Sequence, residues 1–112
     1  MSDPNEKLLD FIRKHGKDYA KACADVEYLR EFRKSKKAIL EIEGAELHGL
    51  KTGQEREAYA YSHPEYKELL DGLRVAVEKE RYLGLMIKGC WVKVDLFRTQ
   101  RADERAERRA YE

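Results

Sequence analysis

The chain has 112 residues, a formal net charge of +1, and charged side chains at 40% of its positions. Because a nearly neutral chain has no global field, binding to nucleic acid or to a membrane surface would have to come from local clusters of charge. The composition, with only seven glycines and two prolines, is typical of long helices or a coiled coil. A chain of this length is expected to form one domain over residues 1–112.

Hydropathy and cysteine content bear on the compartment. No apolar run approaches the ~20 residues that span a bilayer, and no signal peptide opens the chain. The two cysteines, Cys23 and Cys90, are too few for a disulfide framework and fit a reducing cytosol. We therefore expect a cytoplasmic protein with no membrane partner, in which both cysteines pack as small hydrophobic residues.

The first expected element is a short helix over residues 3–15. Ser2 and Asp3 can cap it, Pro4 suits its first turn, and Gly16 is expected to end or bend it. Its apolar face consists of Leu8, Leu9, Phe11 and Ile12. Such a helix would either pack as a clip on the main helices or dock as an arm on a neighbouring subunit.

A long helix is predicted over residues 17–51, because its apolar positions follow the alternating three- and four-residue steps of a coiled-coil seam. This first seam consists of Tyr19, Ala22, Val26, Leu29, Arg33, Lys36, Leu40, Glu43, Leu47 and Leu50. A parallel stripe holds Phe32, Ile39 and Ile42. Gly44 and Gly49 would each cost about 1 kcal/mol inside a helix, so they indicate either a close backbone approach or a loosened last third.

A connection containing a short helix is predicted over residues 52–63, and a second long helix over residues 64–101. Ser62 or His63 can cap the second long helix, and Pro64 suits its first turn. The second seam consists of Tyr66, Leu69, Leu73, Ala76, Glu80, Leu83, Ile87, Cys90, Val94, Phe97 and Arg101. A further stripe holds Leu70, Val77, Met86 and Trp91. Residues 102–112 are expected to form a charged helical tail with a frayed end.

Two long helices of matched length joined by a short connection predict an antiparallel, coiled-coil-like hairpin. We expect Lys51 to lie opposite Pro64. That register pairs Lys36 with Glu80, Cys23 with Cys90, Leu29 with Met86 and Ile87, and Tyr19 with Phe97. Because two helices cannot shield both stripes of each, we also expect self-association, as a dimeric four-helix bundle or a ring of hairpins.

The residues offer little for catalysis. His15, His48 and His63 are scattered, and the chain has no HExxH, no CxxC and no glycine-rich phosphate loop. His48 has Glu41, Glu46 and Glu57 near it in the sequence, without the paired Glu-x-x-His pattern of a metal site in a helical bundle. We therefore expect a protein that is not an enzyme and that uses no cofactor or metal ion.

Three basic clusters are candidates for binding. Arg30, Lys34 and Lys37 share one helix face, with Arg33 at its border. Lys51 and Arg56 lie at the hairpin tip, followed by Tyr59 and Tyr61. Arg98, Arg101, Arg105 and Arg108 form a stripe on the last helix.

These clusters have two interpretations. Each can be a solvated, salt-bridged helix face. Alternatively, cations with interleaved aromatic rings suit single-stranded nucleic acid, because phosphates meet the charges and bases stack on the rings. In an oligomer, repeated clusters would form a continuous basic track.

A resemblance rests on three motifs between Gly53 and Arg108. They are Arg56-Glu57-Ala58-Tyr59-Ala60, Pro64-Glu65-Tyr66 and Phe97-Arg98-Thr99-Gln100. The tract resembles a group of small helical proteins of phages and prophages, which usually have tryptophan where this chain has Phe97. The match covers about half of the chain closely. It implies a phage-encoded protein, and hence the host cytoplasm.

More loosely, the plan resembles phage recombination mediators, which are oligomers of helical hairpins that load recombinase onto single-stranded DNA. Residues 42–62 are similar in order to their binding segment. This resemblance implies single-stranded DNA binding in recombination or replication, through Lys51 and Arg56, with a recombinase or another phage or host protein as a further partner. The alternative, favoured by the near-zero net charge, is a protein-interaction module, such as a phage inhibitor or scaffold, that binds no nucleic acid.

Overall fold

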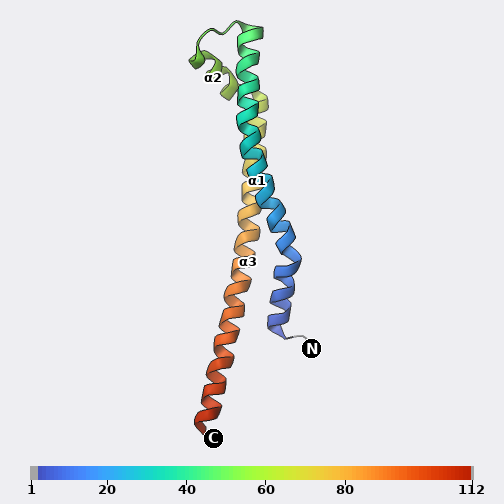
Figure 1. Ribbon diagram of the computed structural model, residues 1–112, viewed down its shortest axis with the longest axis vertical. Helices are drawn as coiled ribbons and strands as arrows, with labels where there is room; N and C mark the ends of the chain where they lie inside the picture. The colour runs from blue at the N-terminus through green and yellow to red at the C-terminus, as the bar shows by residue number, and fades with distance from the viewer. Residues whose placement is uncertain (1–2, 112) are drawn as a thin grey trace. The chain divides into compact units, whose positions relative to one another are not determined.

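The computed structural model describes residues 3–111, which form three α-helices and no strand (Figure 1). Helix α1 spans Pro4–His48, α2 spans Gly53–Ser62 and α3 spans Pro64–Tyr111. The all-helical class expected from the composition is confirmed. The helical continuation over the tail is also confirmed, because α3 runs without a break to Tyr111.

The prediction of two helices over 3–15 and 17–51 is wrong, because α1 is continuous through Gly16. A glycine stops a helix when it adopts a left-handed backbone conformation. Among the described residues, Gly49 is the one with positive φ, at 64°, and α1 ends immediately before it. The predicted cap at the start of α1 is confirmed for Asp3, whose Oδ1 accepts a hydrogen bond from Asn5 N–H at 3.1 Å. Ser2 lies outside the described residues.

The contacts divide the chain into two units. Unit 1 combines α1 up to Ala20 with α3 from Arg81 onward, and unit 2 comprises Lys21–Glu80. In unit 1, Arg101 donates hydrogen bonds to both carboxylate oxygens of Asp3 at 2.7 Å. A Cβ placed on Gly84 would lie 3.0 Å from the ring of Tyr19. Tyr19 therefore packs against Gly84, and the predicted pairing of Tyr19 with Phe97 is wrong.

Unit 2 is built on the return of α2 along the last turns of α1, which Figure 1 shows. Thr52 caps α2, with its Oγ1 accepting a hydrogen bond from Glu55 N–H at 3.1 Å. Tyr59 then packs on Gly44, where an added Cβ would lie 3.0 Å from the tyrosine ring. The close backbone approach that Gly44 indicated is confirmed.

The return of α2 sets where α3 begins. Lys36 Nζ lies 2.5 Å from Glu65 Oε2, at the first turn of α3. The predicted pairing of Lys36 with Glu80 is therefore wrong by about four helical turns. The reason is that α2 uses its ten residues to run back along α1, so that α3 starts beside the last third of α1, near Lys36 and Glu43, instead of opposite Lys51.

The seams describe burial better than they describe pairing. On α3, the seam positions from Tyr66 to Phe97 are all buried or half-buried, and Arg101 is exposed. Unit 2 has a small core in which Leu40, Ala60 and Tyr66, one residue from each helix, are buried together. The stripes beside the seams remain largely exposed, with Ile39 at 55% and Ile42 at 57%.

Candidate nucleic-acid interface

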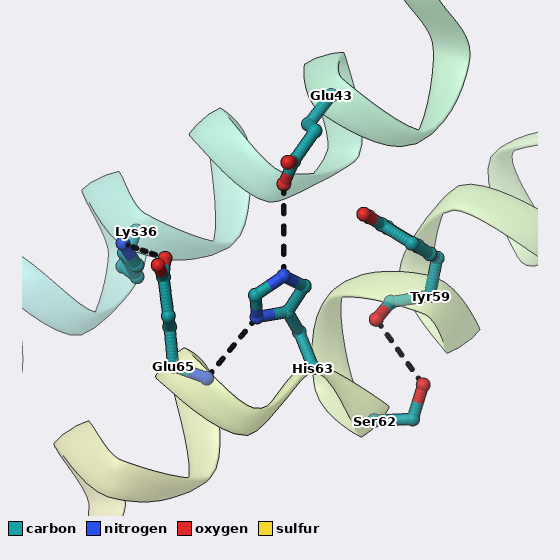
Figure 2. Close-up of polar contacts among 6 residues, drawn as sticks. All are labelled: Lys36, Glu43, Tyr59, Ser62, His63 and Glu65. Carbon is teal, nitrogen blue, oxygen red and sulfur yellow. Dashed lines mark hydrogen bonds and ion pairs between the residues drawn. The ribbon is translucent and has the colours of Figure 1, made fainter. Parts of the chain in front are cut away.

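The junction between α2 and α3 is held by polar contacts around His63. Its Nδ1 accepts a hydrogen bond from Glu65 N–H at 3.1 Å, so His63 caps α3 as the sequence suggested. Its Nε2 lies 3.8 Å from Glu43 Oε2 on α1. Figure 2 shows the imidazole between the two helices, with the pair of Lys36 and Glu65 beside it. Ser62 closes α2 by donating to the carbonyl oxygens of Ala58, at 2.8 Å, and Tyr59, at 3.2 Å.

This junction carries Tyr61 and Tyr66 to the basic face of α1. There a surface hollow of about 280 Å³ is lined by Arg33, Lys34, Lys37, Tyr61 and Tyr66, which we call the basic pocket. The cations come from two successive turns of α1, with Arg33 and Lys34 on one and Lys37 on the next, and the two tyrosines come from the end of α2 and the start of α3. The tyrosine rings meet edge to face, with their centroids 5.3 Å apart.

Lys37 is the most constrained cation of the basic pocket. Its Nζ lies 4.8 Å from the centroid of the Tyr61 ring, and 3.3 Å and 3.8 Å from carboxylate oxygens of Glu57 and Glu41. Hydrogen bonding with the Tyr61 side chain raises the pKa of Lys37 above its usual value; partial burial works against this, and Glu57 adds to it. Lys37 is therefore a permanent cation at physiological pH that holds the Tyr61 ring in place.

The other two cations differ in their partners. Lys34 Nζ lies 3.2 Å from Glu31 Oε1, and both side chains are 69% exposed. An exposed pair of this kind contributes little and exchanges readily with water and ions. Arg33 is half-buried and makes no ion pair within residues 3–111. Arg33 and Lys34 are thus the cations of the pocket that are most available to an anion.

The second predicted cluster does not form one binding surface. Arg56 donates to the carbonyl oxygens of Leu50, at 2.9 Å, and Lys51, at 3.4 Å, so its guanidinium closes the turn between α1 and α2. Tyr59 is half-buried, with its ring centroid 5.1 Å from that of His48 and 5.7 Å from that of His63. Burial, followed by the charge of Glu43, raises the pKa of Tyr59. Of this cluster, Tyr61 alone lines the basic pocket, while Lys51 is exposed on the turn.

The remaining predicted residues lie outside the basic pocket. Arg30 is exposed on α1 of unit 2 and does not line the hollow. In unit 1, Arg101 is engaged with Asp3, and Arg105 donates its Nε–H to the Arg101 carbonyl at 3.3 Å. The hydrogen bonds between Arg101 and Asp3 lower the pKa of the aspartate and raise that of the arginine. Arg98 is exposed.

The sequence placed Arg33 only at the border of the first basic cluster and did not indicate Tyr66 as a site residue, because both occupy seam positions. Arg33 is a cation in the first seam and Tyr66 an aromatic residue in the second, and the periodicity assigns both to packing. Tyr66 is indeed only 6% exposed. A signal was present in Arg33, since a charged residue at a seam position must reach solvent, a partner or a ligand.

Metal-ligand groups and membrane-spanning stretches are both absent from the described part of the chain. Within residues 3–111, no three histidine, cysteine, aspartate or glutamate side chains are grouped so that they could hold a metal ion. None of the described helices has an apolar stretch that could cross a bilayer. Comparisons with models of known protein families, with curated proteins and with solved structures found no match for this chain.

Proposed function

We propose that this chain is a non-enzymatic protein that binds single-stranded DNA, with the basic pocket of unit 2 as the contact site. The observation that carries the proposal is the meeting of three cations with a tyrosine ring that is 44% exposed, Tyr61. Arg33 and Lys34 would neutralise phosphates, and the open face of Tyr61 would stack on a base. Lys37 would orient the ring and add a third positive charge.

The proposed binding is electrostatic and therefore sensitive to salt. If all three cations meet phosphates of a single strand, the logarithm of the binding constant should fall against the logarithm of salt concentration with a slope of about −2 per pocket. A duplex holds its bases in the stack, so Tyr61 would gain no partner there. Single strands should therefore bind more tightly than duplex of the same length.

The proposal includes the quaternary arrangement that the sequence predicted. In it, α1 and α3 form an antiparallel hairpin and hairpins self-associate, so that one assembly presents several basic pockets to one strand. Linked sites gain affinity because the second contact is intramolecular. Together with the resemblance to phage proteins, the proposed role is that of an accessory protein in phage recombination or replication.

Fluorescence anisotropy with labelled single- and double-stranded oligonucleotides across a salt series tests the proposal. The variant Arg33→Ala/Lys34→Ala removes the two most available cations and should weaken single-strand binding at low salt at least about tenfold. Arg13→Ala/Lys14→Ala is a matched control, because it removes the same two residue types from an exposed site on α1 in unit 1. Absence of single-strand binding at low salt, or equal loss in both variants, would refute the proposal.

A second candidate is a protein-interaction module that binds no nucleic acid. The observation that favours it is the local neutralisation of the pocket: Lys34 pairs with Glu31, and Lys37 pairs with Glu41 and Glu57. A charged partner protein would exchange these pairs for its own. A protein captured from host extract that stays bound after nuclease treatment, and that is lost in Arg33→Ala/Lys34→Ala, would support this candidate over the first.

A further inference from the structure

Unit 1 presents a row of exposed apolar side chains on α3 that the seam does not include. Tyr82, Leu85, Val92 and Leu96 are 62%, 70%, 52% and 57% exposed. With Gly89 between them, they follow steps of three, four, three and four residues, which is the spacing of a coiled-coil contact. We call these five residues the outer stripe.

The outer stripe lies on a different face of α3 from the seam. At the ~100° per residue of an α-helix, its centre is roughly 140° around the axis from the centre of the seam residues of unit 1. Those seam residues, Leu83, Ile87, Cys90, Val94 and Phe97, are buried or half-buried. Within the described part of unit 1, Val94 is the one residue of the buried core. This unit therefore exposes more large apolar side chains on its outer face than it fully buries.

Gly89 in the middle of the outer stripe has no explanation within the chain. A Cβ added to it would meet nothing within 4 Å, so no neighbouring group requires a glycine. Glycine inside a helix is unfavourable unless something approaches the backbone closely. Gly89 lies at the centre of the outer stripe, with Tyr82 and Leu85 on its N-terminal side and Val92 and Leu96 on its C-terminal side.

We propose that a second copy of this chain docks antiparallel on the outer stripe, with Gly89 of both copies at the two-fold axis. In this register Tyr82 packs against Leu96 of the second copy and Leu85 against Val92. Two helices can approach closely where glycine faces glycine. The interface uses the same patch on both copies, as a closed two-fold dimer requires.

The flanking charges favour this occupant and this orientation. Arg81, Lys88 and Asp95 lie at the same edge of the outer stripe. The antiparallel register brings Arg81 of each copy to Asp95 of the other, which gives two attractive pairs against the single contact of Lys88 with Lys88 beside the axis. A parallel register would instead bring Lys88 of each copy to Lys93 of the other. Opposite charges across an interface select register and partner, while like charges oppose association.

This inference assigns a face to the self-association proposed above and does not depend on nucleic-acid binding. Sedimentation equilibrium from low to high micromolar concentration tests it. The wild type should sediment as a dimer of the 13.2 kDa chain. Leu85→Glu/Val92→Glu places carboxylates opposite each other and should raise the dimer dissociation constant at least about 100-fold. Both positions are exposed, so the helical circular dichroism spectrum of the variant should be unchanged.

Two further variants make the test specific. Leu47→Glu is the matched control, because Leu47 is 70% exposed like Leu85 but lies on α1 in unit 2; it should leave the dimer intact. Arg81→Asp alone should weaken the dimer, and Arg81→Asp/Asp95→Arg should restore it. A monomeric wild type, a dimer that survives Leu85→Glu/Val92→Glu, equal dissociation by Leu47→Glu, or no rescue by the double charge reversal would overturn the proposal. Because strand binding is read by anisotropy and dimerisation by mass, failure of either proposal is recognised separately.

Discussion

Gly16 and Gly49 offer a paired test of the fold, because the same substitution should have opposite effects at the two positions. Gly16 lies inside α1, and Gly49 follows its end with φ at 64°. A Cβ added at either position meets nothing within 4 Å. Neither substitution should therefore change stability through a steric clash. The effects of Gly16→Ala and Gly49→Ala should differ only because the backbone conformation differs at the two positions.

The expected magnitudes follow from helix propensity and from the left-handed region. Alanine is favoured over glycine inside a helix by about 1 kcal/mol, so Gly16→Ala should increase the free energy of unfolding by that amount. At Gly49 the left-handed conformation costs a residue with a Cβ about 1–2 kcal/mol. Part of that cost is offset because alanine loses less backbone entropy on folding, leaving a net destabilisation of about 1 kcal/mol.

The assay is thermal and urea unfolding followed by circular dichroism, with all proteins at one concentration. A difference of about 2 kcal/mol between the variants corresponds to melting temperatures roughly 10 °C apart for a chain of this size. If Gly16→Ala destabilised the protein as Gly49→Ala does, Gly16 would be a helix stop, as its sequence context suggests. The continuous α1 would then be wrong. Gly53→Ala, at the exposed start of α2, serves as a control that should change little.

Three further predictions concern unit 2. Gly44→Ala should fail to give the usual gain of about 1 kcal/mol and should lower the melting temperature instead, because its Cβ would lie 3.0 Å from the Tyr59 ring. Thr52→Ala should cost roughly 1 kcal/mol in urea unfolding, because it removes the α2 cap; an unchanged midpoint would show that the cap is dispensable. The Lys36 hydrogen bond lowers the pKa of Glu65 below its usual value of about 4.5. The stability that this ion pair contributes is therefore fully present above about pH 4.5 and is lost as the pH falls through the lowered pKa of Glu65. Glu65→Gln should remove this contribution to the loss of stability in acid.

The periodicity of the sequence predicted the helical class and the buried face of α3, whereas on α1 the seam residue Leu47 is 70% exposed. A side chain is buried on a long helix only if it recurs with the period of the contact, so the three- and four-residue steps identify the buried face. This is why the seam from Tyr66 to Phe97 is buried or half-buried throughout. The same logic predicted that the stripe of Phe32, Ile39 and Ile42 would stay exposed on two helices.

Periodicity could not fix which residues face each other. A heptad seam is nearly unchanged when it slides by one repeat, so a register needs a second constraint. The expected ion pair of Lys36 with Glu80 was the wrong constraint on the register. Lys36 instead pairs with Glu65, which lies closer to the turn. Gly16 misled for a related reason: a glycine can stop a helix or sit inside one, and the sequence around it does not show which backbone conformation it adopts.

The direction of α2 is the feature on which both the register and the candidate site depend. Had residues 53–62 continued away from α1, Lys51 could have faced Pro64, and the tip would have combined Lys51 and Arg56 with both tyrosines. Instead α2 returns along α1, Arg56 closes the turn, and Tyr59 packs on Gly44. Tyr61 is thereby delivered about three turns down α1, to Lys37. Cations and aromatic rings that are separate in the sequence are brought together by the reversal of one ten-residue helix. The sequence therefore predicted that cations and tyrosines would form the site, but it could not predict which of them would meet.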